Sequence, residues 1–143
     1  RAGVSGVRGA AGGRGLWDEV LVGTGDSSVD SGEALTHELM AEAEPPTAIF
    51  CFSDEMAIGA IAALRERGLD CPRDVSVVGF DDIRYARAFH PALTTISQPK
   101  EAIGRKAVEM LLAILAKKAD GLASITLPHE LVVRASTAPP PAA

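Results

Sequence analysis

The centre of this chain carries two apolar runs of strand length, one on each side of a helix-forming segment. Residues 48–52 (AIFCF) and 76–80 (SVVGF) are almost entirely apolar, as strands are when a sheet is covered on both faces. Between them, Ser53 or Asp54 can cap a helix that ends with basic residues and Gly68. Strand, helix and strand within about 30 residues form a βαβ unit. We therefore expect two parallel strands joined by a right-handed crossover.

Further elements are predicted on the N-terminal side of this unit. Residues 16–22 (LWDEVLV) have the composition of a short strand. Asp30 and Glu33 then stand in the spacing of a capping box. The helix pattern that follows ends ahead of Pro45, and its apolar residues share one helical face: Ala34, Leu35, Leu39 and Met40. We expect a strand, a loop and a helix before the central unit.

The C-terminal side predicts a strand, a long helix and a last strand. Residues 93–97 (LTTIS) form the first strand, and Pro99 opens the helix. Residues 125–134 (ITLPHELVVR) form the last strand, in which Pro128 predicts an edge position or a bend. The helix carries one apolar stripe: Ile103, Ala107, Met110, Leu111 and Ile114. This chain has little spare sheet to cover that stripe, so we expect a further part of the protein upstream.

The composition is that of a folded chain that is not itself a nucleic-acid-binding surface. With 47% hydrophobic and 23% charged residues, wholesale disorder is excluded. A net charge of -5 and an aromatic content of 4% argue against a basic patch and against a base-stacking platform. No apolar run reaches the length of a membrane span, and residues 1–15 lack the apolar core of a signal peptide. We predict no membrane association.

The residues that most often carry chemistry do not form a recognisable catalytic or metal motif. Cys51 and Cys71 are far apart and form no C-x-x-C pair. His37, His90 and His129 fall on separate predicted elements without the spacing of metal ligands. The glycine-rich stretches match neither common phosphate-binding motif, and no nucleophile elbow is present. We therefore predict no metal, no cofactor and no enzymatic activity.

Two aspartates do stand where a ligand would be expected. Asp54 follows the first central strand and Asp81 follows the second. Open α/β sheets bind ligands in the crevice beyond the carboxyl ends of their strands. An ionised carboxylate only accepts hydrogen bonds, so a ligand rich in hydroxyl or amine donors would suit these positions. Capping of the helix is an equally good interpretation of Asp54, whereas Asp81 has no helix to cap.

At these residues the chain resembles the lactose-repressor (LacI/GalR) family of bacterial transcriptional regulators. The matching blocks are PTAIFCFSDEMAIGAIAALRERGLDCPRDVSVVGFDDI, HPALTTISQP and ITLPHELVVRAST. The resemblance implies an α/β, parallel-sheet fold of the periplasmic-binding-protein type I, with two subdomains hinged around an effector cleft. This chain would be an incomplete copy, mainly the C-terminal subdomain. The DNA-binding helix-turn-helix would be absent from it.

The same resemblance implies a division of the chain into three parts. Residues 1–97 would belong to the C-terminal subdomain of the effector-binding domain. Residues 98–124 would form a helix that packs on the missing N-terminal subdomain. Residues 125–143 would contribute the final strand of the C-terminal subdomain and a tail. This division accounts for the uncovered apolar stripe.

Four effector-binding residues follow from the resemblance, position by position. Asp81 matches a carboxylate that commonly binds effector hydroxyls, and Asp54 follows Ser53 as in the family. Ser53 occupies a position often held by asparagine. Ser27 follows the Gly-Asp pair where many sugar-binding members place an aromatic stacking residue. The implied effector is a sugar-like or other polar metabolite.

Similar proteins dimerise through the C-terminal subdomain. Met56, Ile58 and Phe89 match the positions that would form this interface in a homodimer. Packing in the core of one subunit is an equally good interpretation of Met56 and Ile58. Phe89 sits in a polar loop, where an exposed aromatic more often marks a partner surface.

The leading hypothesis for function is the effector-binding and dimerisation part of a cytoplasmic repressor. A small ligand would select one closure state of the two subdomains and so change the affinity for operator DNA. The operator contacts would lie in an upstream helix-turn-helix. The alternative is a secreted solute-binding protein of the same fold that serves a transporter, although the block LVVRAST favours the repressor.

Overall fold

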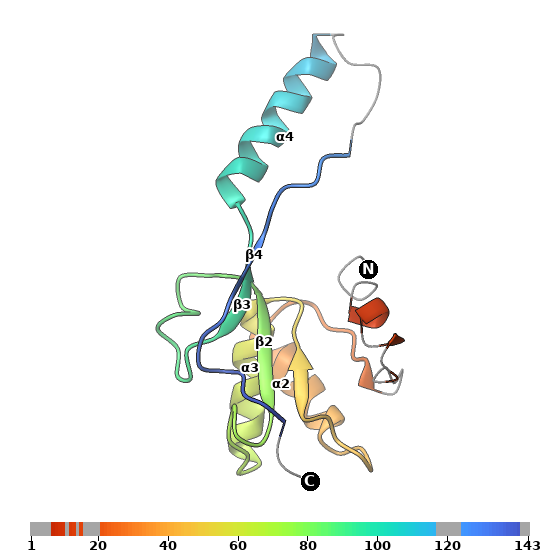
Figure 1. The fold of residues 1–143 in the computed structure, drawn as a ribbon, viewed down its shortest axis with the longest axis vertical. Coiled ribbons are helices and arrows are strands. Elements are labelled where there is room, and N and C mark those ends of the chain that lie inside the picture. Colours follow the sequence, from red (N-terminus) through yellow and green to blue (C-terminus); the bar gives the residue numbers. More distant parts are fainter. Residues whose placement is uncertain (1–6, 11, 14, 16–20, 117–123, 141–143) are drawn as a thin grey trace.

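The computed structural model describes residues 7–10, 12–13, 15, 21–116 and 124–140 (Figure 1). Its labelled elements, in chain order, are α2 (Val29–Leu39), β1 (Ala48–Phe50), α3 (Asp54–Glu66), β2 (Ser76–Asp81), β3 (Thr94–Ser97), α4 (Lys100–Leu115) and β4 (Glu130–Val132). None of the helices among these residues is long and apolar enough to cross a membrane.

Within the part of the chain that the structure describes, four strands form one mainly parallel sheet in the order β1-β2-β3-β4. Ile49 pairs with Val77 and Phe80 pairs with Ile96, and both pairings are parallel. The predicted βαβ unit is therefore confirmed as β1, α3 and β2. β4 is antiparallel to β3 and lies at the edge, as Pro128 predicted. The strand predicted over 125–134 is shorter than expected, because residues 124–129 form no ladder and a proline has no N–H to contribute to one.

The start of α2 differs from the predicted capping box. Ser28, not Asp30, is the N-cap, and its Oγ accepts a hydrogen bond from the Ser31 backbone N–H at 3.1 Å. Asp26 in turn accepts bonds from the backbone and hydroxyl of Ser28, which lower the Asp26 pKa to about 2. Of the strand predicted over 16–22, residues 16–20 lie outside the described residues. Residues 21 and 22 are not in a strand.

Both ends of α3 follow local signals that the sequence carries. Ser53 is the N-cap, and its Oγ accepts from the Met56 backbone N–H at 3.1 Å. At the other end, the Leu69 N–H bonds to the Leu64 carbonyl at 2.9 Å, and Gly68 takes a φ of 75°. This is the Schellman ending that glycine favours because it lacks a Cβ. Both predicted ends are confirmed.

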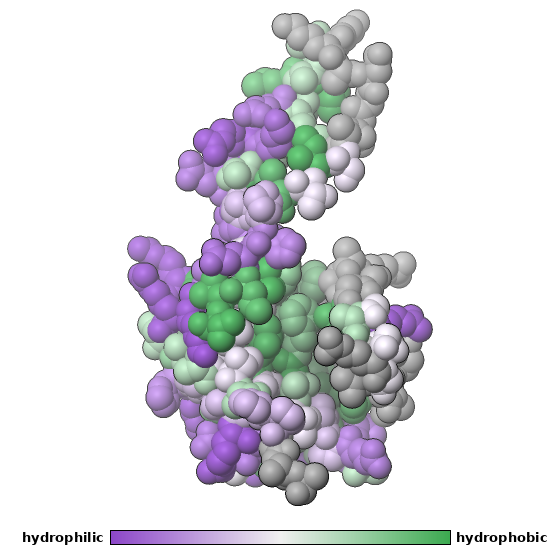
Figure 2. Space-filling model, viewed as in Figure 1, coloured by the Kyte–Doolittle hydropathy of each residue, from purple (hydrophilic) through white to green (hydrophobic). Residues whose placement is uncertain are grey.

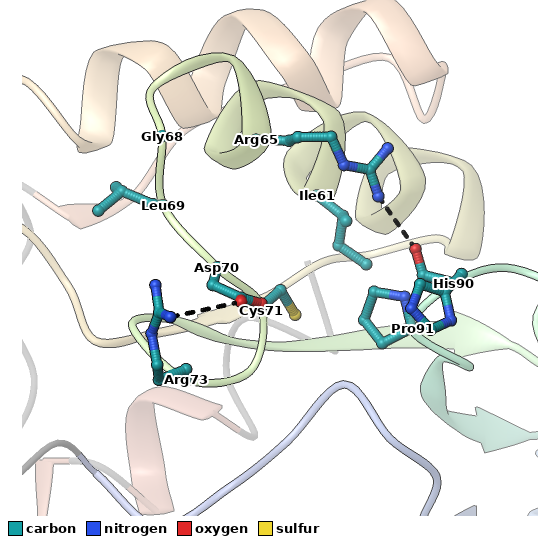
Figure 3. A pocket seen from close by; sticks show the side chains of 9 residues that line it. All are labelled: Ile61, Arg65, Gly68, Leu69, Asp70, Cys71, Arg73, His90 and Pro91. Atoms are coloured by element: carbon teal, nitrogen blue, oxygen red, sulfur yellow. Dashed lines mark hydrogen bonds and ion pairs between the residues drawn. The ribbon is translucent and has the colours of Figure 1, made fainter.

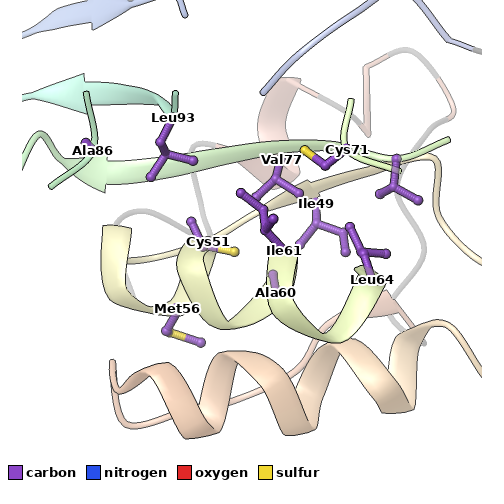
Figure 4. Packing of buried hydrophobic residues seen from close by; sticks show 12 residues of the cluster. Ile49, Cys51, Met56, Ala60, Ile61, Leu64, Cys71, Val77, Ala86 and Leu93 are labelled. Atoms are coloured by element: carbon purple, nitrogen blue, oxygen red, sulfur yellow. The ribbon is translucent and has the colours of Figure 1, made fainter. Parts of the chain in front are cut away.

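The core lies between the sheet and α3, and α2 packs on the far side of α3 (Figure 4). Two glycines allow α2 and α3 to approach closely. A Cβ on Gly32 would collide with the backbone of Met56, and a Cβ on Gly59 would collide with the backbone of Val29. The buried cluster comprises Ile49, Cys51, Met56, Ala57, Ala60, Ile61, Leu64, Cys71, Val75, Val77, Ala86 and Leu93.

α4 extends away from this body, as Figure 1 shows. None of its residues is buried, and apolar side chains stand open along it in Figure 2. The exposed large hydrophobic residues of α4 are Ile103, Val108, Leu111, Leu112 and Leu115. Of the stripe that the sequence predicted, Ile103, Ala107 and Leu111 are exposed, whereas Met110 and Ile114 are half-buried.

Candidate functional site

The parallel strands bring their carboxyl ends to one edge of the sheet, and three predicted site residues lie there. Ser53 and Asp54 follow β1, and Asp81 is the last residue of β2. Burial is the main cause of a raised Asp54 pKa, and the negative charges of Asp81 and Asp82 add to it. The topology thus brings Ser53, Asp54 and Asp81 to one edge of the sheet, as the sequence predicted.

Asp81 sits in an unusual backbone turn, to which two side chains at the start of α4 bond. Its φ is 111° and that of Asp82 is 52°, conformations that residues other than glycine seldom adopt. The Gln98 Nε2 donates to the Asp81 Oδ1 at 2.5 Å. The Lys100 Nζ donates to the backbone carbonyl of Asp81 and, at 3.2 Å, to that of Asp82. These bonds hold the half-buried Asp81 carboxylate at the end of the sheet.

Asp82 has a different partner from Asp81. Its Oδ1 accepts from the Arg134 Nη2 at 2.7 Å, and this guanidinium keeps the Asp82 pKa below its ordinary value. Arg134 also donates to the Leu93 carbonyl at 2.8 Å. The pair therefore ties the turn after β2 to the segment after β4.

Replacing Arg134 by glutamine is expected to lower the free energy of unfolding by about 1–3 kcal/mol. The side chains of Arg134 and Asp82 are only 17% and 25% exposed, so the substitution leaves a partly buried carboxylate without its cation. Arg105→Gln is the matched control, because its pair with Glu101 is 4.0 Å long and 64% and 93% exposed. Urea unfolding should show a change within about 0.5 kcal/mol for that control. Equal losses in both variants would contradict a stabilising role for the Arg134 pair.

Asp54 is fully buried and both of its carboxylate oxygens bind the protein. The Thr95 hydroxyl donates to Oδ1 at 2.5 Å, and the Ile83 N–H donates to Oδ2 at 2.7 Å. Burial raises the Asp54 pKa, against the effect of these two bonds. Ser53 takes the capping role that the sequence left open for Asp54. The structure therefore places Asp54 behind the site, where it joins α3 to β3 and to the turn after β2.

Ser53 and Ser27, predicted from distant parts of the chain, lie side by side. The Ser53 Oγ donates to the Ser27 carbonyl at 3.0 Å while it also caps α3. Ser53 is 4% exposed, so its hydroxyl faces protein. Ser27 is exposed and has a φ of 72°. Of this pair, Ser27 has the side chain open to solvent.

Aromatic rings, which the sequence analysis did not assign to the site, lie at the same end of the sheet. Phe52 and Phe80 are stacked with ring centroids 6.2 Å apart and planes 2° apart. Phe50 meets Phe80 edge-on at 6.4 Å. Phe52 is 52% exposed. The sequence did carry one indication of this. Phe52 is the last apolar residue before the capping Ser53, and it is adjacent to the buried Cys51, so the two side chains point to opposite faces of the sheet.

The predicted interface residues occupy different environments. Met56 is 8% exposed and belongs to the core, where Figure 4 shows it facing α2. The sequence allowed either a core or an interface position for Met56, and in this chain Met56 packs in the core. Ile58 is half-buried. Phe89 is also half-buried and packs against the core cluster.

Two surface cavities accompany these features. One, of about 370 Å³, lies at the C-terminal end of α3, away from the strand ends. In Figure 3 Ile61 points into it, and Arg65 reaches the His90 carbonyl at 3.1 Å. The other, of about 540 Å³, lies between α4 and residues 125–129, and its lining includes Phe80 and Gln98. The second cavity adjoins the candidate site and the first does not.

One histidine lies beside two carboxylates, a grouping that histidine spacing alone did not predict. Glu33, His37 and Glu66 have ligand-type atoms within 4.8 Å of one another. The His37 Nε2 and the Glu66 Oε2 are 3.2 Å apart, with side chains 35% and 62% exposed. An exposed hydrogen bond between His37 of α2 and Glu66 of α3 accounts for this grouping. We assign it no metal.

Residues 5–137 match the family model of the periplasmic binding protein-like domain. The chain is 45% identical over 123 residues to the HTH-type transcriptional repressor PurR of Pectobacterium carotovorum subsp. carotovorum, which covers 86% of this chain and 36% of that protein. It is 46% identical over 117 residues to PurR of Yersinia pestis bv. Antiqua, with coverage of 82% and 34%. The chain thus spans about a third of the length of these curated relatives.

Solved structures show the same relationship. The transcriptional regulator CelR in complex with cellobiose superimposes with a TM-score of 0.87 and 36% identity, covering 93% of this chain and 41% of that one. A LacI transcriptional regulator from a Rhodococcus species superimposes with a TM-score of 0.84 and 37% identity, covering 94% of this chain and 50% of that one. A LacI-family regulator from Enterococcus faecium with bound ribose gives 0.68, 34% identity, and coverage of 78% and 41%. These similarities confirm the predicted resemblance to LacI-family regulators, and the chain belongs to the family of periplasmic binding protein-like domains.

Proposed function

We propose that this chain is the effector-binding and dimerisation part of a transcriptional repressor. The observation that carries the proposal is the Asp81 carboxylate, held at the carboxyl end of β2 by Gln98 in a fold shared with ligand-binding regulators. The similar structures with bound cellobiose and ribose support a sugar-like or other polar effector. Asp81 accepts hydrogen bonds from the effector, and Ser27 lies beside the bound effector.

The mechanism is thermodynamic linkage between two states of the complete protein. Residues 1–97 and 125–143 form one subdomain, and residues 98–124 contribute a helix to the other. A ligand between the subdomains changes operator affinity only by as much as it prefers one state. Operator DNA is bound through an upstream helix-turn-helix. The exposed apolar side chains of α4 support this division, because they require a partner surface.

The protein acts in the cytoplasm as a homodimer and catalyses no reaction. Ile58 and Phe89 contribute to the dimer interface, whereas Met56 supports it from the core. The curated relatives are repressors rather than enzymes, which favours regulation over catalysis. The same relatives make a secreted solute-binding protein the less supported alternative.

Asp81→Asn in the complete protein tests the proposal. Asparagine also tolerates a positive φ, so the turn is kept while the negative acceptor is lost. We expect effector affinity to fall by about 10- to 100-fold, since a hydrogen bond to a charged group contributes about 1.5–3 kcal/mol. Operator affinity without effector should stay unchanged, because the carboxylate contacts ligand and not DNA.

The measurement is operator binding by fluorescence anisotropy, titrated with cellobiose and ribose separately. Asp30→Asn is the matched control, because Asp30 is an exposed aspartate in the first turn of α2. A full effector response in the Asp81 variant would remove this carboxylate from the site. No operator binding by the complete wild-type protein would reject the repressor function itself.

A further inference from the structure

Two segments of the chain leave the same end of the sheet, as Figure 1 shows. The first runs from β3 through Gln98 into α4, and the second returns through residues 124–129 into β4. None of the residues of α4 is buried, so apolar packing within the described part of the chain does little to fix the direction of this helix. Polar bonds at its first turn therefore carry more of that task.

Lys100, the first residue of α4, bonds to the turn after β2. Its Nζ donates to the carbonyl of Asp81 and, at 3.2 Å, to the carbonyl of Asp82. Because both carbonyls bond to one ammonium group, they point toward the same side of the turn. A charged donor makes a stronger hydrogen bond than a neutral one. The other charged side chains of α4 that have a partner among the described residues pair inside the helix: Lys106 with Glu109 and Arg105 with Glu101.

The turn that receives these bonds is held by the body of the domain. Its two central residues have φ values of 111° and 52°, which persist only where the surrounding structure maintains them. The Asp82 N–H donates to the Thr95 hydroxyl at 3.4 Å, and the Ile83 N–H donates to Asp54 at 2.7 Å. Arg134, which follows β4, binds the Asp82 carboxylate at 2.7 Å. The turn is thus a firm anchor, tied to β3, to α3 and to the segment after β4.

We propose that Lys100 is a latch that fixes the direction of α4 by binding the two carbonyls of the turn after β2. The inference rests on the proposed division of the complete protein into two subdomains, because α4 then belongs to one of them and the turn belongs to the other. While Lys100 is bound, the two subdomains keep the arrangement that the structure shows at this crossing. Release of Lys100 frees the first turn of α4 and allows a second arrangement.

The latch also gives the proposed effector contact a route to the other subdomain. Asp81 offers its carboxylate to the effector and its backbone carbonyl to Lys100. A ligand that moves this residue therefore acts on the same turn that holds α4. A ligand shifts such an equilibrium only by as much as it prefers one of the two arrangements.

The test measures distances in the complete protein by double electron–electron resonance between two spin labels. Arg105→Cys on α4 and Glu42→Cys after α2 are the label positions, because both residues are exposed. Cys51 and Cys71 are buried free cysteines, so labelling favours the two introduced thiols. Labelled subunits are mixed with an excess of unlabelled ones, so that distances between subunits do not contribute.

Lys100→Met keeps a long side chain and removes its donors. Lys100 is exposed, so the substitution leaves the core intact. We expect a second distance to gain population over the wild-type distance, with their ratio changed by about two- to tenfold, as the loss of a hydrogen bond implies. Lys100→Arg keeps a cation with several donors and should retain the wild-type distance. Lys106→Met is the matched control, because Lys106 bonds to Glu109 of the same helix at 3.0 Å.

The wild-type distance distribution in Lys100→Met would overturn the latch, and so would equal shifts in Lys100→Met and Lys106→Met. Operator binding by the wild-type protein, measured separately, distinguishes the latch from the proposed function. A shift specific to Lys100→Met in a protein that binds no operator would support the latch and reject the repressor function. Operator binding together with an unchanged distribution would do the reverse.

Discussion

Replacing Gly59 by alanine is expected to lower the free energy of unfolding by about 3 kcal/mol. The new Cβ would stand 2.8 Å from the Glu33 backbone nitrogen and closer still to the Val29 carbonyl oxygen. Both obstacles are backbone atoms, so no rotamer change can relieve the collision. α2 must then move away from α3, which opens the packing between them. This cost exceeds the gain of about 1 kcal/mol that alanine brings over glycine in a helix.

Gly104→Ala separates the collision from helix propensity. Gly104 lies inside α4, and a Cβ there would meet nothing within 4 Å. Only the propensity gain remains, so the variant should be neutral or more stable by up to about 1 kcal/mol. Urea unfolding followed by circular dichroism measures both variants. Equal stability of the Gly59 and Gly104 variants would show that α2 and α3 do not pack as closely as the structure has them.

The elements that could be predicted from the sequence are those whose signals are local. The central βαβ unit follows from two apolar runs and one periodic segment, all within the length of a single crossover. Ser53 and Gly68 mark the two ends of α3 because capping depends on backbone groups only a few residues away. The uncovered face of α4 was predictable for a related reason, since an apolar stripe is a property of one helix.

The start of α2 was predicted wrongly because two capping patterns overlap there. Asp30 and Glu33 have capping-box spacing, but Ser28 stands two residues earlier and bonds to Ser31. Asp26 decides between them, because it binds the backbone and hydroxyl of Ser28 and fixes the turn. Spacing alone does not contain that preference.

The site was predictable only in part, since its geometry depends on contacts distant in sequence. Asp81 could be placed at a strand end from the order of the elements. The partners of Asp54 could not, because Thr95 lies 41 residues away and Ile83 lies 29 residues away. The stacking of Phe52 on Phe80 is likewise a contact between neighbouring strands. A sequence suggests which residues end at the same edge but not which of them touch.

Asp54→Ala is expected to lower the free energy of unfolding by about 3 kcal/mol or more. The substitution removes one acceptor from two donors, the Thr95 hydroxyl and the Ile83 N–H, in a fully buried place. Each unsatisfied buried donor costs about 1–3 kcal/mol. Asp54→Asn is the milder comparison, because its carbonyl can still accept from Ile83 and its amide can donate to the Thr95 hydroxyl.

The difference in free energy of unfolding between the wild type and Asp54→Asn is also expected to depend on pH. Burial raises the Asp54 pKa in the folded state above its unfolded value of about 3.9. The folded protein then binds this proton more tightly than the unfolded chain does. The stabilising contribution is complete below pH 3.9 and is lost as the pH rises through the folded pKa. Asparagine does not titrate, so the free energy of unfolding of Asp54→Asn lacks this pH dependence. The variant should therefore be less destabilised relative to the wild type at pH 7 than at pH 4.

Urea unfolding of both proteins at these two pH values isolates Asp54 from the other carboxylates. The pKa values of Asp26, Asp74 and Asp82 are lowered, so their stabilising effect is lost as the pH falls, opposite to that of Asp54. Asp26 and Asp74 titrate equally in wild type and variant, so their effects cancel in the difference. Asp82 interacts with Asp54, but its bond to Arg134 keeps its pKa below the ordinary value in both proteins, so it stays ionised between pH 4 and pH 7. A difference that stays constant from pH 4 to pH 7 would mean that burial does not raise the Asp54 pKa. A difference that becomes smaller from pH 4 to pH 7 would show that Asp54, which joins α3 to β3, is a buried acid whose ionisation lowers the free energy of unfolding near neutral pH.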